Sequence, residues 1–336
     1  MLGFVGAHGR GTVATAAFAL TAGLLLAPGS PLHPSTALAA SGPCGLLTYN
    51  PQDPPAYDHV VVVMDENLSY SGFTRSTQAT YLHGLSAACG SETNMHGATH
   101  PSQSNYMALT SGVATGPTVH TAGDNIFHQA QVAGDTWRDY AESMPKNCSP
   151  NVSTTPAYKA GHTPPYWYTD LTTPTKTCAL YDVPMTPALD SAIAADTLPT
   201  FAWITPDLCH DMHGDPTCPV AQSSRVAAGD TWLAALLPRL TALASYRTGK
   251  TLIIVTFDEG SEGNATGVDC TDPAYYSLHV DCHIATIVLS AYIRPGAVDS
   301  EDHNLYGLLG TFEDVLGYPR LGRAVGASSL RSGLGF

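Results

Sequence analysis

The amino-acid sequence predicts an α/β fold in which a mostly parallel central sheet is covered by helices on both faces. Four short segments consist almost entirely of apolar residues: 59–64, 198–206, 251–257 and 284–290. Such runs are typical of strands buried on both faces of a parallel sheet. Segments with a helical pattern separate them along the chain, and a hydrophobic content of 44% is sufficient for a large core.

The first 40 residues have the pattern of a secretory signal peptide. Arg10 precedes an apolar run over residues 13–27, and the small-residue stretch STALAAS offers a cleavage position after Ala39 or Ala40. The apolar run is shorter than the roughly 20 residues that a membrane-spanning helix needs. The sequence therefore predicts a secreted chain without a transmembrane segment, with a single domain over residues 41–336.

All eight cysteines lie in the part of the chain that follows residue 40. An even number of cysteines in an exported protein indicates disulfide bonds, although the pairing cannot be derived from the count. We expect each cysteine to pair with the next one along the chain, because each such bond closes a modest local loop. A zinc site is the weaker alternative, since no C-x-x-C pair is present. The expected bonds are Cys44–Cys89, Cys148–Cys178, Cys209–Cys218 and Cys270–Cys282.

The remaining elements follow in order. Helices are expected over residues 77–88, 101–110, 136–144, 229–243 and 304–317. Asp230 is a suitable N-cap for the fourth of these helices. The stretch from 145 to 187 is dense in Pro, Thr and Tyr and contains two cysteines, so we expect a long, disulfide-bonded excursion there rather than a linker.

The charge of the chain limits its partners. There are 14 Lys and Arg residues against 28 Asp and Glu residues, a formal net charge of −14. An acidic protein repels nucleic acid and anionic membrane surfaces, so we expect no nucleic-acid partner. An anionic substrate would need a local cation to receive it.

Acidic and imidazole side chains follow several of the predicted strands. The stretch VVVVMDEN at 60–67 runs directly from a buried strand into three polar residues, and burying these without partners would cost several kcal/mol. Because the carboxyl ends of parallel strands meet at one edge of a sheet, these groups would line one cavity, where divalent metal ions would neutralise them. The groups are Asp65, Glu66 and Asn67; Asp207, His210, Asp211 and His213; Asp258 and Glu259; and His303.

Each of these groups also has a purely structural interpretation. Glu66 and Asn67 could cap the next segment, and the pair Asp258–Glu259 could form a turn. A disulfide-bonded loop could hold Asp211 and His213 for structural reasons, and His303 could be exposed. Lone histidines are usually structural or solvated, so no role is assigned to His120, His128 or His162.

A nucleophile is expected in the stretch GATHPSQSNYMALTSG at 97–112. Pro101 suits the first turn of a helix, which places Thr99 or His100 near the N-cap. A hydroxyl at that position faces free backbone N–H groups, which can receive a phosphate or sulfate. The alternative is a helix cap with no further function.

Six stretches, read together and in order, resemble one protein family. They are HVVVVMDENLSY, THPSQSNYMALTSG, WITPDLCHDMHG, GDTWLAALLPRL, TLIIVTFDEG and HNLYGLLGTFEDVLGYPRLG. The chain is similar over residues 57–325 to the bacterial and fungal phosphoesterases, a family of secreted acid phosphatases and phospholipase C-type enzymes within the alkaline phosphatase superfamily. The resemblance implies an alkaline-phosphatase-like core, divalent metal ions and the hydrolysis of phosphate esters.

The resemblance also implies roles for individual residues. Glu66, Asp211, Asp258 and Glu259 are the expected metal ligands, and Thr99 is the expected nucleophile, with Ser102 as the alternative. Asn67 would donate to a phosphoryl oxygen, while His213 and His303 would complete the metal shell or protonate the leaving group.

We therefore expect a metal-dependent phosphatase that hydrolyses small phosphate monoesters through a phosphothreonine. The alternatives are a phospholipase C-type phosphodiesterase and a non-catalytic metal-binding module. A sulfatase would need Arg in a C/S-x-P-x-R setting, where this chain has Gln103. The metal's identity and the oligomeric state remain open.

Overall fold

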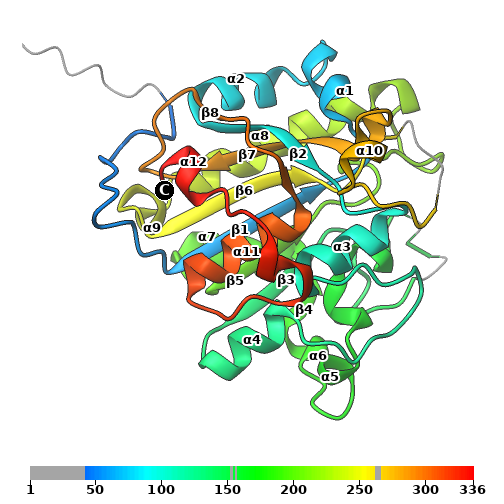
Figure 1. Ribbon diagram of the computed structural model, residues 1–336. Helices are drawn as coiled ribbons and strands as arrows, with labels where there is room; N and C mark the ends of the chain where they lie inside the picture. The colour runs from blue at the N-terminus through cyan, green and yellow to red at the C-terminus, as the bar shows by residue number, and fades with distance from the viewer. Residues whose placement is uncertain (1–41, 152–153, 156, 262–265) are drawn as a thin grey trace, which may run out of the picture. The chain divides into compact units, whose positions relative to one another are not determined.

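The computed structural model describes residues 42–151, 154–155, 157–261 and 266–336 (Figure 1). The signal peptide predicted over residues 1–40 lies outside the described residues and stays a prediction. Every helix in the described part of the chain is too short or too polar to cross a lipid bilayer.

The centre of the fold is a nine-stranded sheet in the order β4-β3-β5-β1-β6-β7-β2-β8, with β9 paired to β2. All pairings are parallel except those of β7, which runs antiparallel to both β6 and β2. This confirms the predicted fold class. The strands are β1 His59–Asp65, β2 Gly90–His96, β3 Trp137–Ala141, β4 Asp182–Pro184, β5 Phe201–Thr205, β6 Thr251–Phe257, β7 His283–Leu289, β8 Ala297–Asp299 and β9 His303–Asn304.

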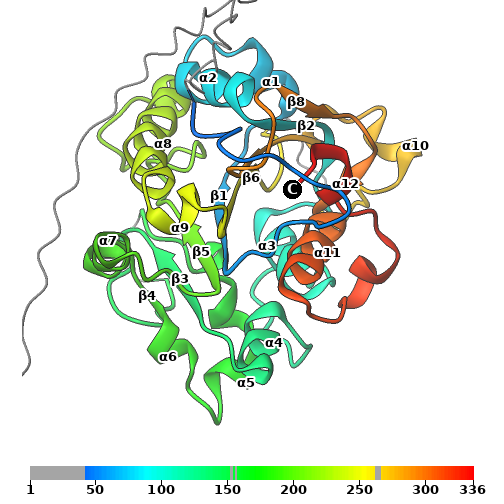
Figure 2. The same cartoon turned by 90° about the vertical axis from the view of Figure 1, so that its left-hand side faces the viewer.

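Helices cover both faces of this sheet. Figure 2 shows α7 and α8 on one side of the strands, and α3, α4 and α11 on the other. The helices are α1 Tyr70–Arg75, α2 Thr80–Ala88, α3 Ser102–Ser111, α4 Ile126–Ala133, α5 Thr169–Thr172, α6 Cys178–Tyr181, α7 Met185–Ala195, α8 Arg225–Thr241, α9 Ala244–Arg247, α10 Pro273–Tyr276, α11 Leu305–Leu316 and α12 Arg331–Leu334. The apolar strands are buried between these two layers, as their uninterrupted hydrophobic sequences require.

The position of β1 explains its sequence. It lies between β5 and β6, where Val62 pairs with Trp203 on one side and with Ile254 on the other. Residues 60–64 of β1 are completely buried. A strand in this position needs apolar side chains on both faces, and the four consecutive valines and the methionine provide them.

Two expectations about secondary structure are wrong. Residues 136–144, predicted as a helix, contain β3, because that segment gains ladder hydrogen bonds from β4 and β5 on its two sides. Asp230, predicted as an N-cap, lies inside α8, which begins at Arg225, and its carboxylate accepts the backbone N–H groups of Tyr81 and Leu82 in α2. Contacts with distant parts of the chain determined both outcomes, and local composition does not indicate such contacts. The disulfide-bonded excursion predicted over residues 145–187 is confirmed by the Cys148–Cys178 bond.

All four disulfide bonds follow the expected sequential pairing: Cys44–Cys89, Cys148–Cys178, Cys209–Cys218 and Cys270–Cys282. The bonds are therefore local along the chain. Two of them hold loops that contribute acidic residues to the site described below, namely Cys209–Cys218 and Cys270–Cys282.

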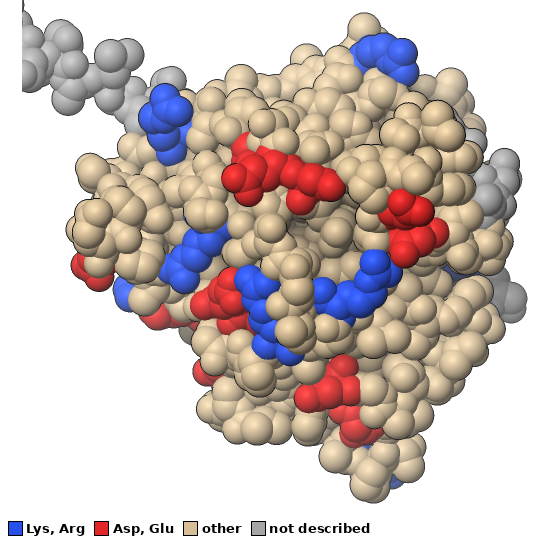
Figure 3. Space-filling view, in the orientation of Figure 1, with Lys and Arg blue, Asp and Glu red and all other residues tan. Residues whose placement is uncertain are grey.

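The described surface carries charges of both signs. In the view of Figure 3, Lys and Arg side chains form small groups that are separated by neutral surface and by Asp and Glu. Charge on this face is therefore distributed in patches.

Candidate active site

The carboxyl ends of β1 and β6 bring four of the predicted acidic residues together. These strands are adjacent and in register up to Asp65 and Phe257, so the residues that follow them leave the sheet side by side. The backbone N–H of Asn67 donates to Asp258 Oδ1 at 3.1 Å. The loop after β5 joins them, since the backbone N–H of Glu66 donates to the carbonyl of Asp211 at 2.7 Å.

These carboxylates are buried and only partly paired. Glu66, Asp211 and Asp258 have no exposed surface, and Glu259 is 6% exposed. Burial in the first place, and then repulsion by neighbouring carboxylates, raises the pKa values of Glu66, Asp211 and Asp258 well above their ordinary range. Among the described residues, one oxygen of each of these three side chains lacks a hydrogen-bond partner. Buried, unpaired carboxylate oxygens fit a divalent cation, because such ions prefer oxygen ligands.

Asp65 adds a further buried carboxylate behind this group. Both of its oxygens lack a hydrogen-bond partner among the described residues, and burial raises its pKa well above the ordinary value. The backbone N–H of Asp258 donates to the carbonyl of Asp65 at 3.2 Å. Asp65 therefore belongs to the acidic interior at the ends of β1 and β6.

Asn67 occupies a backbone conformation that few residues adopt. Its φ angle is 53°, in the left-handed region where asparagine is tolerated better than most residues. In this conformation the side-chain amide donates to Glu66 Oε2 at 2.6 Å. Non-glycine residues held in such conformations concentrate at functional sites, which agrees with the predicted role of Asn67.

The first residue of α3 places a hydroxyl between two of the carboxylates. Ser102 Oγ lies within hydrogen-bond distance of two carboxylate oxygens, 2.9 Å from Glu66 Oε2 and 3.1 Å from Glu259 Oε1, and its one proton can be donated to either. The hydroxyl of Thr99, our first candidate for the nucleophile, donates instead to the carbonyl of His100 at 3.3 Å. The structure therefore brings Ser102, the alternative candidate, into contact with the acidic cluster.

The segment before α3 is held by the side chain of Asn105. Its Oδ1 accepts hydrogen bonds from the backbone N–H groups of Ala98 and Thr99, and its Nδ2 donates to the carbonyl of Thr99. The same Nδ2 donates to Glu259 Oε2 at 3.1 Å. Asn105 thus fixes the approach to α3 relative to Glu259, and this also fixes the position of Ser102.

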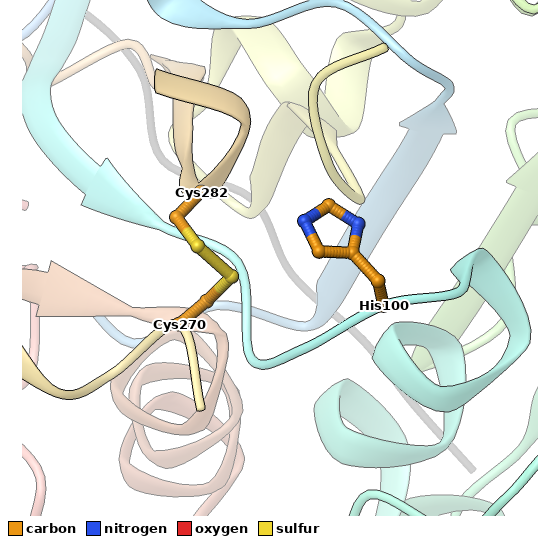
Figure 4. A group of neighbouring side chains, drawn as sticks. All are labelled: His100, Cys270 and Cys282. Atoms are coloured by element: carbon orange, nitrogen blue, oxygen red, sulfur yellow. A yellow bond between two sulfur atoms is a disulfide. The ribbon is translucent and has the colours of Figure 1, made fainter. Parts of the chain in front are cut away.

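His100, which was expected only near the N-cap of a helix, is part of this site. Its Nδ1 lies 2.7 Å from Glu259 Oε2, and its Nε2 lies 2.6 Å from Asp281 Oδ2. Figure 4 shows its ring beside the Cys270–Cys282 disulfide. The two sulfur atoms are bonded to each other and are not free thiolates, so His100 bridges two carboxylates beside a disulfide.

His162 is a second residue that sequence reasoning left without a role. Its Nε2 lies 3.3 Å from Glu66 Oε1, and its Nδ1 lies 3.6 Å from Asp211 Oδ2. The ring stacks on Tyr106 of α3 with a centroid separation of 5.0 Å. Burial lowers the pKa of His162 well below the usual value, which favours the neutral ring, the form that binds metal ions.

A cavity of about 450 Å³ opens beside Ser102. Its wall includes the predicted residues Asn67, His213 and Glu259, together with His162. Lys159 also lines it and supplies a basic side chain beside the acidic cluster. A cavity of this volume suits a small substrate, and a cation at its wall suits an anionic one.

His213 lies on the wall of this cavity, next to Asp211. The backbone N–H of His213 donates to Asp211 Oδ1 at 2.8 Å, and its Nδ1 lies 2.6 Å from the carbonyl of Gly214. Asp211 and His213 are therefore joined by a hydrogen bond, with Asp211 in the acidic interior and His213 on the cavity wall.

His303 is placed differently from the other predicted residues. Its side chain is buried, and its Nε2 lies 3.3 Å from Asp299 Oδ2 and 3.7 Å from Glu92 Oε2. The strand that carries it, β9, pairs with β2 rather than with β1 or β6. His303 thus belongs to a second cluster.

Solved structures define the class of this fold. A protein of the alkaline phosphatase superfamily from Vibrio parahaemolyticus superposes with a TM-score of 0.54 at 13% identity, covering 85% of this chain and 74% of that chain. The phosphonate monoester hydrolase of Agrobacterium radiobacter superposes with a TM-score of 0.50 at 12% identity, covering 82% of this chain and 77% of that chain. The architecture is therefore that of the alkaline phosphatase superfamily.

Sequence comparison identifies the family. The pattern of the Phosphoesterase family matches residues 71–319, so the chain belongs to that family and is a phosphoric ester hydrolase. It is 29% identical over 282 residues to the phosphatidylinositol-3-phosphatase of Mycobacterium tuberculosis, covering 81% of each chain. It is 25% identical over 246 residues to an acid phosphatase of Aspergillus fumigatus, covering 68% of this chain and 51% of that relative. The chain thus spans about half the length of the second relative.

Proposed function

We propose that this protein is a secreted, metal-dependent phosphatase that hydrolyses phosphate monoesters through a phosphoserine formed on Ser102. The observation that carries the proposal is the position of the Ser102 hydroxyl. It lies at the start of α3, within hydrogen-bond distance of Glu66 and Glu259, and borders the cavity of about 450 Å³. Secretion is supported by the four disulfide bonds, which persist in oxidising compartments.

The residues that would hold the metal are Glu66, Asp258 and Glu259, with His162 and Asp211 beside them. The unpaired buried oxygens of Glu66 and Asp258 support this assignment. When bound, a divalent ion supplies positive charge that stabilises the phosphoryl oxygens and lowers the pKa of a coordinated hydroxyl.

The residues of the chain divide the reaction between them. Ser102 Oγ forms a bond to phosphorus while the bond to the ester oxygen breaks, and its proton passes to one of the carboxylates that already accept it. Asn67 and the free N–H groups at the start of α3 donate to the phosphoryl oxygens. His213 protonates the leaving alkoxide, and a water molecule then releases phosphate from Ser102.

The lining and volume of the cavity and the names of the two relatives favour a phosphate monoester as the substrate. A dianionic group would be attracted by Lys159 at the wall, and the volume leaves room for a modest leaving group. Both curated relatives are phosphatases by name. The alternative functions are a phospholipase C-type diesterase and a non-catalytic metal-binding module, and the test below distinguishes them from the proposed function.

The test compares phosphate release from a small aromatic phosphate monoester and from the matching diester. We expect turnover of the monoester that is lost on chelation, restored by a divalent ion, and abolished in Asp258→Asn. Asp190→Asn, which alters an exposed ion pair with Arg239, is the matched control and keeps full turnover. Circular dichroism after chelation completes the test. Faster diester hydrolysis supports the phospholipase alternative, and unfolding on chelation with no turnover supports the binding module.

A further inference from the structure

A second cluster of potential metal ligands is built on the outer strands of the sheet. Glu92 lies on β2, Asp299 on β8 and His303 on β9. Both β8 and β9 pair with β2, and Glu92 is directly in register with Asp299. The topology of this part of the sheet therefore places two carboxylates and one imidazole together. Their relative exposures are 1%, 4% and 1%.

Each carboxylate in this cluster commits one oxygen to the backbone and directs the other towards the histidine. Glu92 Oε1 accepts the N–H of Asn94 at 2.6 Å, and Asp299 Oδ1 accepts the N–H of Glu301 at 3.0 Å. The remaining oxygens, Glu92 Oε2 and Asp299 Oδ2, both face His303 Nε2. Glu92 Oε2 has no hydrogen-bond partner among the described residues.

Two buried carboxylates in register repel each other unless positive charge lies between them. The ion pairs that these two carboxylates form within the described part of the chain are both with His303. A single imidazolium would neutralise only one of the two negative charges. A divalent cation would neutralise both and would leave the imidazole neutral, which is the form that binds metal.

The spacing of the three atoms matches a metal site. Nε2 lies 3.3 Å from Asp299 Oδ2 and 3.7 Å from Glu92 Oε2, and all three ligand atoms lie within 4.8 Å of one another. Nitrogen and oxygen ligands about 2.1 Å from a tetrahedral zinc ion are about 3.4 Å apart. Both distances exceed the usual length of an N–H···O hydrogen bond to a charged group, which is about 2.8 Å.

We propose that Glu92, Asp299 and His303 bind a divalent transition-metal ion, with zinc as the best match, at a site separate from Ser102. Water fills the remaining coordination position. Such an ion would tie β8 and β9 to β2 and would fix the start of α11, which follows β9 directly. Its role is to stabilise the fold.

The experiment is anomalous diffraction at the zinc edge from crystals of the whole protein equilibrated with zinc, together with the zinc content of the protein in solution. We expect an anomalous peak between Glu92, Asp299 and His303, independent of any peak at Ser102. Glu92→Gln should lose that peak and one equivalent of zinc. Its melting temperature should no longer rise with zinc to the wild-type extent. Glu301→Gln, which changes an exposed carboxylate of the same loop, is the matched control and should behave as wild type.

Peaks confined to the surroundings of Ser102, or unchanged zinc content in Glu92→Gln, would overturn the proposal and identify the cluster as a metal-free ion pair. The anomalous map of the wild-type protein decides the question even if Glu92→Gln fails to fold. The result is also independent of the function proposed for Ser102, because the two positions give separate peaks.

Discussion

Replacing Ser102 with alanine is the most direct test of the site. The substitution removes one oxygen, which in the structure lies 2.9 Å from Glu66 Oε2 and 3.1 Å from Glu259 Oε1. If this oxygen attacks phosphorus, its loss should lower kcat by at least about 10⁴-fold, or about 5.4 kcal/mol in activation free energy. The matched control is Thr99→Val, which removes the hydroxyl of our first candidate and nearly conserves side-chain volume.

The structure also predicts how each variant affects stability. The single hydroxyl proton of Ser102 is shared between two buried carboxyl groups, and a hydrogen bond to a charged group contributes about 1.5–3 kcal/mol. In the metal-free protein we therefore expect Ser102→Ala to lower the free energy of unfolding by about 2 kcal/mol. Thr99→Val removes one bond of 3.3 Å to the adjacent residue, so its effect should stay below about 1 kcal/mol.

The assay measures steady-state turnover of a small aromatic phosphate monoester at saturating divalent metal. Intact-mass spectrometry of acid-quenched enzyme then detects a covalent phosphoryl group. We expect the adduct in wild type and in Thr99→Val, with turnover of the latter within about threefold of wild type, and no adduct in Ser102→Ala. Full turnover by Ser102→Ala together with an inactive Thr99→Val would refute the reasoning and restore the phosphothreonine.

Three further predictions address the surroundings of the site. Asp281→Asn should lower kcat/KM and metal affinity about 10–100-fold, because Asp281 contacts His100, which in turn orients Glu259. Titration of the variant with metal measures this affinity, and an affinity equal to that of wild type would contradict the prediction. Burial raises the pKa of Glu313 on α11 from 4.5 to about 8, so the folded state favours the neutral acid and stability falls as pH rises through that interval. The difference in melting temperature between Glu313→Gln and wild type, measured by calorimetry, should therefore change in favour of the variant from pH 4.5 to pH 8. A difference that stays constant over this pH range would contradict the prediction. Replacing both Cys209 and Cys218 with serine opens a loop with a sequence separation of 9 and should lower the free energy of unfolding by about 3 kcal/mol. Denaturant unfolding measures this change, and an unchanged midpoint would show that other contacts hold the loop.

The sequence allowed a correct prediction of the central strands and of the acidic residues at their ends. Strands β1 and β6 have apolar central runs, at residues 60–64 and 252–255, and are followed directly by Glu66 and Asp258. The order of residues in the sequence was therefore sufficient to predict that these acidic residues lie at the same edge of the sheet. The polar strand β2, with the sequence GSETNMH, has no such pattern and was missed. Its partners β7, β8 and β9 give it a place in the sheet that local residues do not indicate.

Other parts of the site depend on contacts between residues that are far apart in the sequence, and local sequence patterns do not predict such contacts. His162 meets Glu66 from a segment 96 residues further along the sequence, in a region without a strand signal. The choice between Thr99 and Ser102 depends on the residue at which α3 begins, and Ser102 is its first residue. His303 was assigned to the wrong neighbourhood in space because its sequence position does not reveal that β9 pairs with β2.

The sequential arrangement of the disulfide bonds has a consequence for biosynthesis. Each cysteine bonds to the next one along the chain, and the four closed loops do not interlock. A polypeptide emerging amino end first therefore presents both partners of one bond before the next cysteine appears. The first thiol to become available is the native partner each time, so oxidation can proceed in step with emergence and needs little later reshuffling.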